Sequence, residues 1–170
     1  MHVWLIGMMG SGKSSVGEAC ANVLERGWLD TDDLVVALAG RTIPELFDEG
    51  EALFREWERR AVCEASQSPV PLIISCGGGV ANDATNRGLM TNSGSVVWLR
   101  ARPETLVGRV GDTSTRPLLG PDPLETLRRL ELLRTPFYES VADDIIDTDA
   151  VTLDEVVDRV VSYVVVSNGQ

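Results

Sequence analysis

The sequence is short of positive charge, and this shortage excludes two classes of partner. Its 170 residues carry 15 Lys and Arg against 26 Asp and Glu, which gives a formal net charge of −11 at pH 7. Binding to a nucleic-acid backbone or to an anionic membrane depends on a broad basic surface, so we expect neither partner. Any anion that the protein binds must be held locally, by a few placed arginines.

Cysteines are few, and long apolar runs are missing. Cys20, Cys63 and Cys76 are an odd number without C-x-x-C spacing, so they predict neither a disulfide framework nor a zinc site, and a reducing cytoplasm suits them best. The longest late apolar run, 160–166, is interrupted by a serine and a tyrosine and is too short to cross a bilayer. Because the chain begins directly with an apolar run and a glycine-rich loop, we expect no export signal.

What the sequence does contain is an alternation of short apolar runs with helical patterns. This alternation indicates βαβ units and a parallel sheet that is covered on both faces. A chain of this length is expected to form one domain, and no repeat or linker divides it. We therefore predict a three-layer α/β/α fold. The expected strands lie at 3–6, 28–29, 72–75, 95–99 and 144–146.

The most specific motif is GMMGSGKSS at 7–15, which fits the phosphate-binding pattern G-x-x-x-x-G-K-[ST]. Its glycines let backbone N–H groups turn towards phosphate oxygens, and the following helix directs its positive end at the same anion. Lys13 is predicted to reach the β- and γ-phosphates, and the Ser14 hydroxyl to contact Mg²⁺. A flexible Gly/Ser turn is the alternative, but the spacing, the lysine, the hydroxyl and both flanks coincide.

Acidic residues follow the second predicted strand, in LDTDD at 29–33, where an α/β sheet binds its ligands. Near a phosphoryl-transfer site one carboxylate can hold Mg²⁺ through water, and another can orient an acceptor hydroxyl. The alternative is an N-cap cluster for a helix at 33–38, and this stretch taken alone favours that alternative.

Two further stretches have both a plain and a functional interpretation. One face of a long charged helix carries Arg55, Glu58 and Arg59. This face is either a solvated surface with salt bridges, or a binding site in which Glu58 holds Arg55 in position to bind a carboxylate. The glycines at 77–79 close the third strand, either as a plain turn or so that backbone can lie against a ligand. Next to them, Cys76 is expected to be a buried, unreactive thiol rather than a modifiable one.

The segment 111–122, GDTSTRPLLGPD, interrupts the alternation with glycines, prolines and hydroxyl residues and is predicted to be a mobile lid. Its Arg116 is suited to stabilising charge on a transferring phosphoryl group, although an unpaired surface arginine would give the same pattern. We expect Arg134 to end the next helix just before Pro136, where it could join Arg55 on an anionic substrate.

Taken in order, GMMGSGKSS, LDTDD, GEALFREWE, CGGG, STRPLL and LRTPFYES make the chain resemble the shikimate kinases from about residue 6 to residue 148. The resemblance implies a P-loop kinase fold with a five-stranded parallel sheet, within a single domain of residues 1–170. It implies a substrate-binding helical region at about 32–60 and a lid at about 111–122.

The activity implied by the resemblance is ATP-dependent phosphorylation of shikimate to shikimate 3-phosphate with Mg²⁺, by a monomeric cytoplasmic protein. Two alternatives remain open. One is a kinase of another small polyol acid such as gluconate, and the other is a non-catalytic paralogue that binds nucleotide or shikimate.

The resemblance also implies roles for single residues. Catalysis is assigned to Lys13, Asp32 and Arg116, with Asp32 as the base for the acceptor hydroxyl. Nucleotide binding is assigned to Gly10, Ser11, Gly12, Lys13, Ser14, Ser15, Arg109 and Arg116, with Arg109 near the adenine. Shikimate binding is assigned to Asp32, Arg55, Gly77, Gly78, Gly79 and Arg134, with the two arginines on the carboxylate and the glycine backbone on the hydroxyls. The metal is assigned to Ser14 and, through water, to Asp30.

Overall fold

A computed structural model describes residues 1–110 and 122–168 of the chain. At its centre lies a five-stranded sheet in the order β2-β3-β1-β4-β5, and each of its four strand pairs is parallel. The predicted strands are confirmed, and their ends differ from the prediction by at most one residue. The strands are β1 (His2–Ile6), β2 (Gly27–Asp30), β3 (Leu72–Ser75), β4 (Gly94–Arg100) and β5 (Asp144–Asp147).

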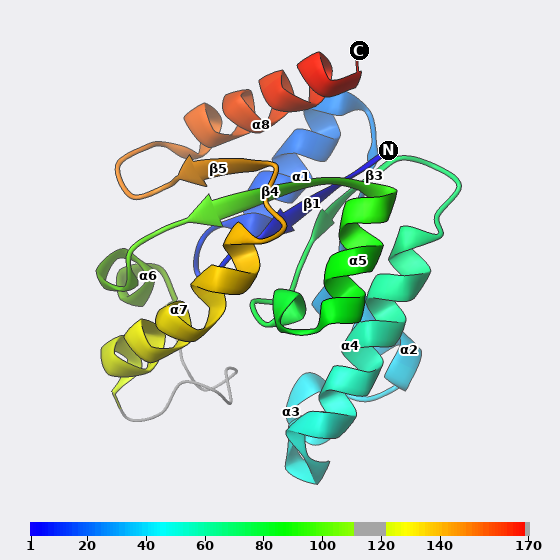
Figure 1. Ribbon diagram of the computed structural model, residues 1–170, viewed down its shortest axis with the longest axis vertical. Helices are drawn as coiled ribbons and strands as arrows, with labels where there is room; N and C mark the ends of the chain where they lie inside the picture. The colour runs from blue at the N-terminus through cyan, green and yellow to red at the C-terminus, as the bar shows by residue number, and fades with distance from the viewer. Residues whose placement is uncertain (111–121, 169–170) are drawn as a thin grey trace.

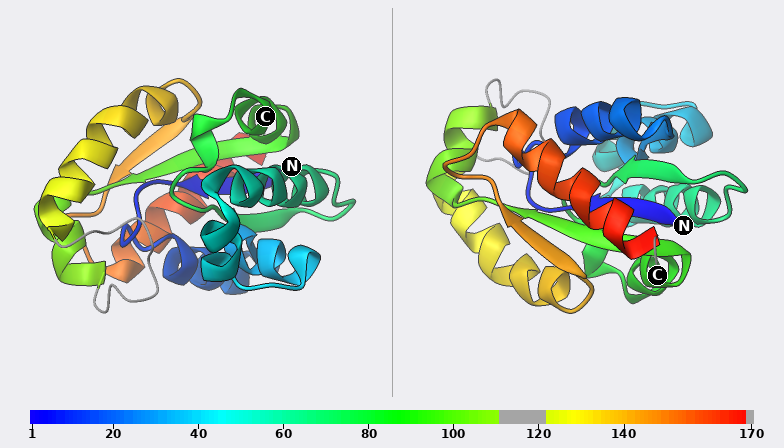
Figure 2. Two further views of the ribbon diagram at one scale, coloured as in Figure 1. Left: turned by 90° about the horizontal axis from the view of Figure 1, so that it is seen from below. Right: turned by 90° about the horizontal axis from the view of Figure 1, so that it is seen from above.

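Helices cover both faces of the sheet, as Figures 1 and 2 show. The helices α1 (Lys13–Leu24) and α8 (Leu153–Asn168) pack on one face, and α4 (Glu51–Ser66), α5 (Ala84–Ser93) and α7 (Pro123–Glu139) pack on the other. The predicted three-layer arrangement is therefore confirmed. The other helical segments described are α2 (Thr31–Ala39), α3 (Ile43–Glu49), the 3₁₀ turn η1 (Val80–Asn82) and α6 (Pro103–Val110).

The alternation of side chains along β1 shows why both faces need a cover. Successive residues of a strand point to opposite faces. Val3 and Leu5 pack with residues of α1 and α8, whereas Trp4 and Ile6 pack with residues of α4, α5 and α7. All five residues of β1 are buried, as is expected of a central strand in a parallel sheet.

A separate helical group projects from the sheet at the lower right of Figure 1. It consists of α2, α3 and the first part of α4, which pack around their own small core of Val35, Leu46, Phe54 and Ala61. This group contains most of the segment 32–60, for which acceptor binding is predicted.

The helix α7 corrects one expectation. It does not end before Pro136 but continues to Glu139. Pro136 has no N–H to donate to the carbonyl of Leu132, and Leu132 itself is 78% exposed. Arg134 and Tyr138, one turn apart, are both buried. Their packing outweighs the local cost of proline, and Arg134 therefore lies inside the helix rather than at its end.

The predicted lid, including Arg116, lies outside the described residues except for Asp122. The Asp122 carboxylate accepts a hydrogen bond from the Glu125 N–H at 3.0 Å and caps α7. No helix in the described part of the chain is long and apolar enough to cross a membrane.

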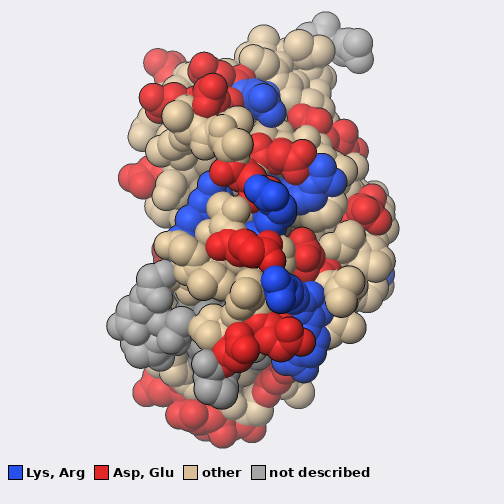
Figure 3. All heavy atoms as spheres, turned by 90° about the vertical axis from the view of Figure 1, so that its left-hand side faces the viewer, with Lys and Arg blue, Asp and Glu red and all other residues tan. Residues whose placement is uncertain are grey.

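The face turned to the viewer in Figure 3 carries Lys and Arg side chains beside Asp and Glu side chains, and its coloured part shows no continuous basic surface. The ion pairs of the described residues follow the same pattern. They include Arg100 with Asp147 at 2.6 Å and Arg128 with Glu104 at 2.8 Å. Many of the surface arginines are therefore neutralised by neighbouring carboxylates.

Candidate active site

A cavity of about 640 Å³ opens where the loops after β1, β2 and β3 meet, at the carboxyl edge of the sheet. Parallel sheets bind ligands at this edge. Ser11, which is also predicted to bind nucleotide, is buried and is not part of the lining. The other predicted residues within the described chain all line the cavity: Gly10, Gly12, Lys13, Ser14, Ser15, Asp30, Asp32, Arg55, Gly77, Gly78, Gly79, Arg109 and Arg134.

The phosphate loop has the backbone that its glycines allow. Gly7, Gly10 and Gly12 have φ values of 142°, 80° and 94°, which side-chain-bearing residues rarely adopt. A Cβ at Gly7 would also lie 2.3 Å from the Leu99 carbonyl oxygen. Because α1 begins at Lys13, directly after this loop, the first N–H groups of the helix lie at the cavity.

Lys13 and Ser14 connect the loop to its surroundings. The buried Lys13 ammonium donates to the Met8 carbonyl across the loop, with a distance of 2.8 Å. The Ser14 hydroxyl donates to Asp30 Oδ2, also at 2.8 Å. The two motifs that the sequence places 16 positions apart therefore meet at one point of the cavity.

Asp30 confirms the N-cap interpretation of LDTDD, and the same carboxylate also contacts the phosphate loop, while the catalytic interpretation stays a prediction. Its Oδ2 accepts from Ser14, and its Oδ1 accepts from the Asp32 N–H at 2.9 Å, which makes it the N-cap of α2. The helix accordingly begins at Thr31, two residues before the predicted start. One carboxylate thus fixes the helix that carries Asp32 and presents an oxygen beside the phosphate loop.

Asp32 has the environment of a proton acceptor. Its Oδ1 is buried and has no hydrogen-bond partner among the described residues. Burial, followed by the charges of Asp30 and Glu58, raises the pKa of Asp32 to about 6, while Lys13 acts in the opposite direction. A carboxylate with this pKa is ionised at neutral pH and can take a proton from a hydroxyl placed in the cavity.

Arg55 is held by two glutamates of its own helix. Its Nη1 donates to both carboxylate oxygens of Glu58, at 2.9 and 3.0 Å, and its Nη2 donates to Glu51 at 2.9 Å. Glu58 is only 1% exposed; burial raises its pKa, which Arg55 and Arg134 oppose. Glu58 therefore steadies Arg55, as the functional interpretation predicts. Arg59 instead pairs with Asp83 at 2.9 Å.

The glycine run makes room for these charged groups. A Cβ at Gly77 would lie 2.6 Å from Asp32 Oδ1, and one at Gly79 would lie 2.5 Å from Arg55 Nη1. The Gly77 N–H already donates to the Thr31 hydroxyl at 2.9 Å. The run is therefore more than a plain turn, because side chains of the site occupy the space that Cβ atoms would need.

Arg134 reaches the cavity from α7. It is 2% exposed, and its Nε has no hydrogen-bond partner among the described residues. Its Nη1 lies 3.8 Å from the Met8 sulfur. Buried N–H groups are normally satisfied, so this arginine is well suited to an anionic ligand in the cavity.

Arg109 reaches the cavity from α6. It donates to the hydroxyl of Thr148 at 2.9 Å and to the carbonyl of the same residue. These bonds fix the last turn of α6 to the segment that follows β5.

The sequence pattern misses three apolar residues of the lining, Ile43, Phe47 and Phe54. The two phenylalanine rings stack with centroids 4.7 Å apart, and the Arg55 guanidinium lies 5.1 Å from the centroid of the Phe54 ring. Helical spacing identifies such residues as core but gives no sign that one side of the core faces a cavity. Cys76 agrees with expectation, because it is buried and burial raises the pKa of its thiol well above the usual range.

Comparison with known proteins gives a consistent result. The family model for shikimate kinase matches residues 9–165. A shikimate kinase of Symbiobacterium thermophilum is 44% identical over 161 residues, which cover 92% of each chain. One of Bordetella pertussis is 40% identical over 90% of this chain and 73% of its own.

Solved structures extend the comparison to the fold. The shikimate kinase from Acinetobacter baumannii in complex with shikimate has a TM-score of 0.93 and 32% identity, covering 98% of this chain and 93% of its own. A gluconokinase from Sinorhizobium meliloti has a TM-score of 0.65 and 22% identity, covering 95% of this chain and 89% of its own. The second likeness shows a shared fold alone.

Proposed function

This chain belongs to the shikimate kinase family, and we propose from that premise how its cavity transfers the γ-phosphoryl group of ATP to shikimate. The products are ADP and shikimate 3-phosphate. The bond between the acceptor oxygen and phosphorus forms, the bond between that phosphorus and the bridging oxygen breaks, and the hydroxyl proton passes to Asp32.

The observation that carries the residue assignment is that Arg55 and Arg134 both lie near the buried Glu58 and line the same cavity as the phosphate loop. A small hydroxy acid presents a carboxylate at one end and hydroxyls at the other. A site for it therefore needs arginines at one end and a proton acceptor at the reacting end. In this assignment Arg55 and Arg134 bind the carboxylate, and Asp32 accepts the proton.

The nucleotide side of the cavity is assigned to the loop and the start of α1. The N–H groups from Gly10 to Ser15 and the Lys13 ammonium hold the phosphates, and this positive environment stabilises the charge that develops during transfer. Arg109 is assigned to the nucleotide base. Arg116 is assigned to the transferring phosphoryl group from its place in the sequence alone, since it lies outside the described residues.

For the metal we propose Mg²⁺ beside Ser14 and Asp30. Their side-chain oxygens, 2.8 Å apart, are of the kind that this hard cation prefers. Mg²⁺ usually takes only one or two protein oxygens and completes its shell with phosphate oxygens and water, so this pair fits it. When bound, the ion would neutralise charge on the β- and γ-phosphates.

We further propose that the protein acts as a monomer in the cytoplasm, with residues 1–170 forming one domain. The cavity is built within one chain, which supports a monomeric site. The three thiols at Cys20, Cys63 and Cys76 are free, which supports a reducing compartment.

The test is the release of ADP from ATP and Mg²⁺ with shikimate, quinate, gluconate or no acceptor. Strong turnover with shikimate alone supports the proposal, and the Asp32→Asn variant should then lose turnover while it still binds ATP. Turnover with gluconate instead would favour the alternative kinase. Protein that binds ATP but turns over none of these acceptors would favour the non-catalytic paralogue.

A further inference from the structure

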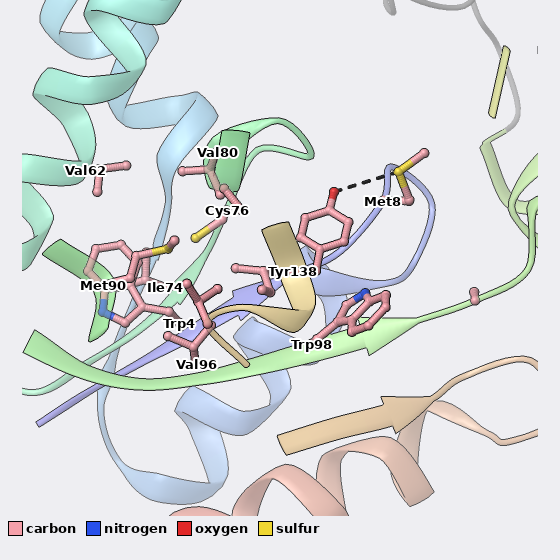
Figure 4. Packing of buried hydrophobic residues seen from close by; sticks show 14 of the residues in the cluster. Trp4, Met8, Val62, Ile74, Cys76, Val80, Met90, Val96, Trp98 and Tyr138 are labelled. Atoms are coloured by element: carbon pink, nitrogen blue, oxygen red, sulfur yellow. Dashed lines mark hydrogen bonds between the residues drawn. The ribbon is translucent and has the colours of Figure 1, made fainter. Parts of the chain in front are cut away.

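Tyr138 lies where three parts of the proposed site meet, and the reaction described above gives it no task. Tyr138 and Arg134 belong to α7, Met8 belongs to the phosphate loop, and Gly78 belongs to the glycine run. The Tyr138 hydroxyl donates to the Gly78 carbonyl and lies 3.8 Å from the Met8 sulfur, towards which it points in Figure 4. The side chain is 1% exposed, and burial raises its pKa to about 12, so its hydroxyl keeps the proton that it donates.

Met8 contacts two of the cationic side chains that line the cavity. Its sulfur lies 3.8 Å from Arg134 Nη1, and its carbonyl accepts from the Lys13 ammonium at 2.8 Å. The residue is 4% exposed and belongs to the core cluster that also contains Tyr138. A displacement of Met8 would therefore move both the cation assigned to phosphate and a cation assigned to the acceptor.

Gly78 packs directly against the phosphate loop. A Cβ at this position would lie 3.2 Å from Arg134 Nη1, 3.4 Å from the Met9 nitrogen and 3.6 Å from the Gly7 carbonyl oxygen. An added Cβ would make ordinary van der Waals contacts with the loop and would require the end of the Arg134 side chain to move by a few tenths of an ångström, so Gly78 fills the space between the loop and Arg134 closely. The distance between the two halves of the site thus depends on where Gly78 is held.

We propose that Tyr138 is a positioning residue whose hydroxyl fixes the Gly78 carbonyl and the Met8 side chain, so that Arg134 and the phosphate loop keep the separation that transfer requires. Errors of about 1 Å in such a separation cost on the order of a hundredfold in rate. The inference rests on the proposed function. The same arrangement couples the two ends of the cavity. A ligand that displaces Arg134 should also displace the phosphate loop, because Met8 and Gly78 contact both.

The variant Tyr138→Phe isolates the hydroxyl from the ring. The ring packs in the core with its centroid 5.4 Å from that of Trp98, and phenylalanine preserves this contact. The matched control is Tyr163→Phe, because Tyr163 is half-buried on α8 and packs against the core on the opposite face of the sheet.

Steady-state kinetics gives the first readout. We expect Tyr138→Phe to raise the KM for the acceptor at least fivefold and to lower kcat, while the Kd for ATP without acceptor stays within twofold of the wild type. Tyr163→Phe should leave all three values unchanged. Wild-type KM and kcat in Tyr138→Phe, even with a lowered Tm, would overturn the proposal and leave Tyr138 a purely structural residue.

A second readout uses the fact that Lys13 is the only lysine in the sequence. Protein labelled with ¹⁵N-lysine gives one backbone amide resonance, which comes from the end of the phosphate loop. Shikimate without nucleotide should shift this resonance in the wild type, and the shift should fall by at least half in Tyr138→Phe. Equal shifts in both proteins would overturn the coupling. A wild type without turnover of shikimate would instead overturn the proposed function, so the two failures are distinguishable.

Discussion

The Ser14 hydroxyl donates a hydrogen bond of 2.8 Å to the Asp30 carboxylate and thereby joins the first turn of α1 to the N-cap of α2. Through this bond the phosphate loop and the helix that carries Asp32 share one carboxylate. Asp30 consequently has two separable properties: it caps a helix, and it places a carboxylate beside the phosphate loop.

Replacing Asp30 with asparagine separates those properties. Asparagine caps helices about as well as aspartate, so α2 should remain intact, but the charge is lost. We expect the Mg²⁺ concentration for half-maximal activity to rise about tenfold, equivalent to about 1.4 kcal/mol. A magnesium titration at saturating ATP and acceptor measures this. The exposed neighbour change Asp33→Asn is the control, and an unaltered magnesium requirement in Asp30→Asn would contradict the metal assignment.

We expect Asp32 to be required for activity although its ionised carboxylate lowers the stability of the folded protein. Its pKa is raised from 3.8 to about 6, so the folded protein holds an ionised Asp32 less readily than the unfolded chain does. The stability that the protonated carboxyl contributes is fully present below pH 3.8 and is lost as the pH rises through about 6.

The variant Asp32→Asn should therefore be inactive but more stable at pH 7.5, by at most about 3 kcal/mol. Denaturant unfolding at pH 7.5 and at pH 4.5 measures the difference between variant and wild type, which should shrink at the lower pH. A variant that is less stable than the wild type at pH 7.5 would show that the Asp32 charge is well satisfied in the fold.

Gly79 should be required for the position of Arg55 rather than for folding. A Cβ there would lie 2.5 to 2.9 Å from the Arg55 guanidinium, which is the end of a flexible side chain and can move aside. We expect Gly79→Ala to raise the acceptor KM at least tenfold with little change in Tm.

The control for Gly79→Ala is Gly88→Ala in α5, where nothing lies within 4 Å of the added Cβ. This change should leave KM unaltered and raise stability by about 0.5–1 kcal/mol, because alanine favours helix over glycine. Equal kinetics for the two variants would remove the proposed role of Gly79.

Removing Arg55 should affect both binding and stability, because it leaves the buried Glu58 without its partner. We expect Arg55→Ala to raise the acceptor KM by two orders of magnitude or more while the Kd for ATP is unchanged. Breaking a buried pair in this way typically costs about 3–5 kcal/mol, although nearby Arg134 should reduce the loss here.

Adding Glu58→Gln to Arg55→Ala should recover most of the lost stability but none of the acceptor affinity. Unfolding in denaturant together with acceptor titration separates the two effects. Arg60→Ala, which removes an exposed pair with Glu56 and a contact with the Trp57 ring on the same helix, should leave acceptor affinity unchanged and lower stability only slightly. Recovery of acceptor binding in the double variant would mean that Arg55 does not bind the acceptor.

Local sequence patterns predict the structure correctly where the backbone conformation is one that a single residue type readily adopts. The phosphate loop is predicted correctly because Gly10 and Gly12 adopt positive φ and Lys13 begins a helix, all of which depend on neighbours in sequence. The end of α7 is predicted wrongly for the opposite reason. Proline at 136 is locally unfavourable, but the burial of Arg134 and Tyr138 depends on elements far away in the chain.

The sequence by itself determined the succession of strands and helices along the chain, the phosphate loop and most of the polar residues that line the cavity, because periodicity, glycine conformation and capping are short-range properties. Only the tertiary structure decided which of these residues meet. It placed Ser14 on Asp30, and within the described part of the chain it left Asp32 Oδ1 without a hydrogen-bond partner. It also set Tyr138 between Gly78 and Met8, 60 and 130 positions away. Contacts of this kind arise when parallel strands bring their carboxyl ends to one edge, and no local pattern encodes that geometry.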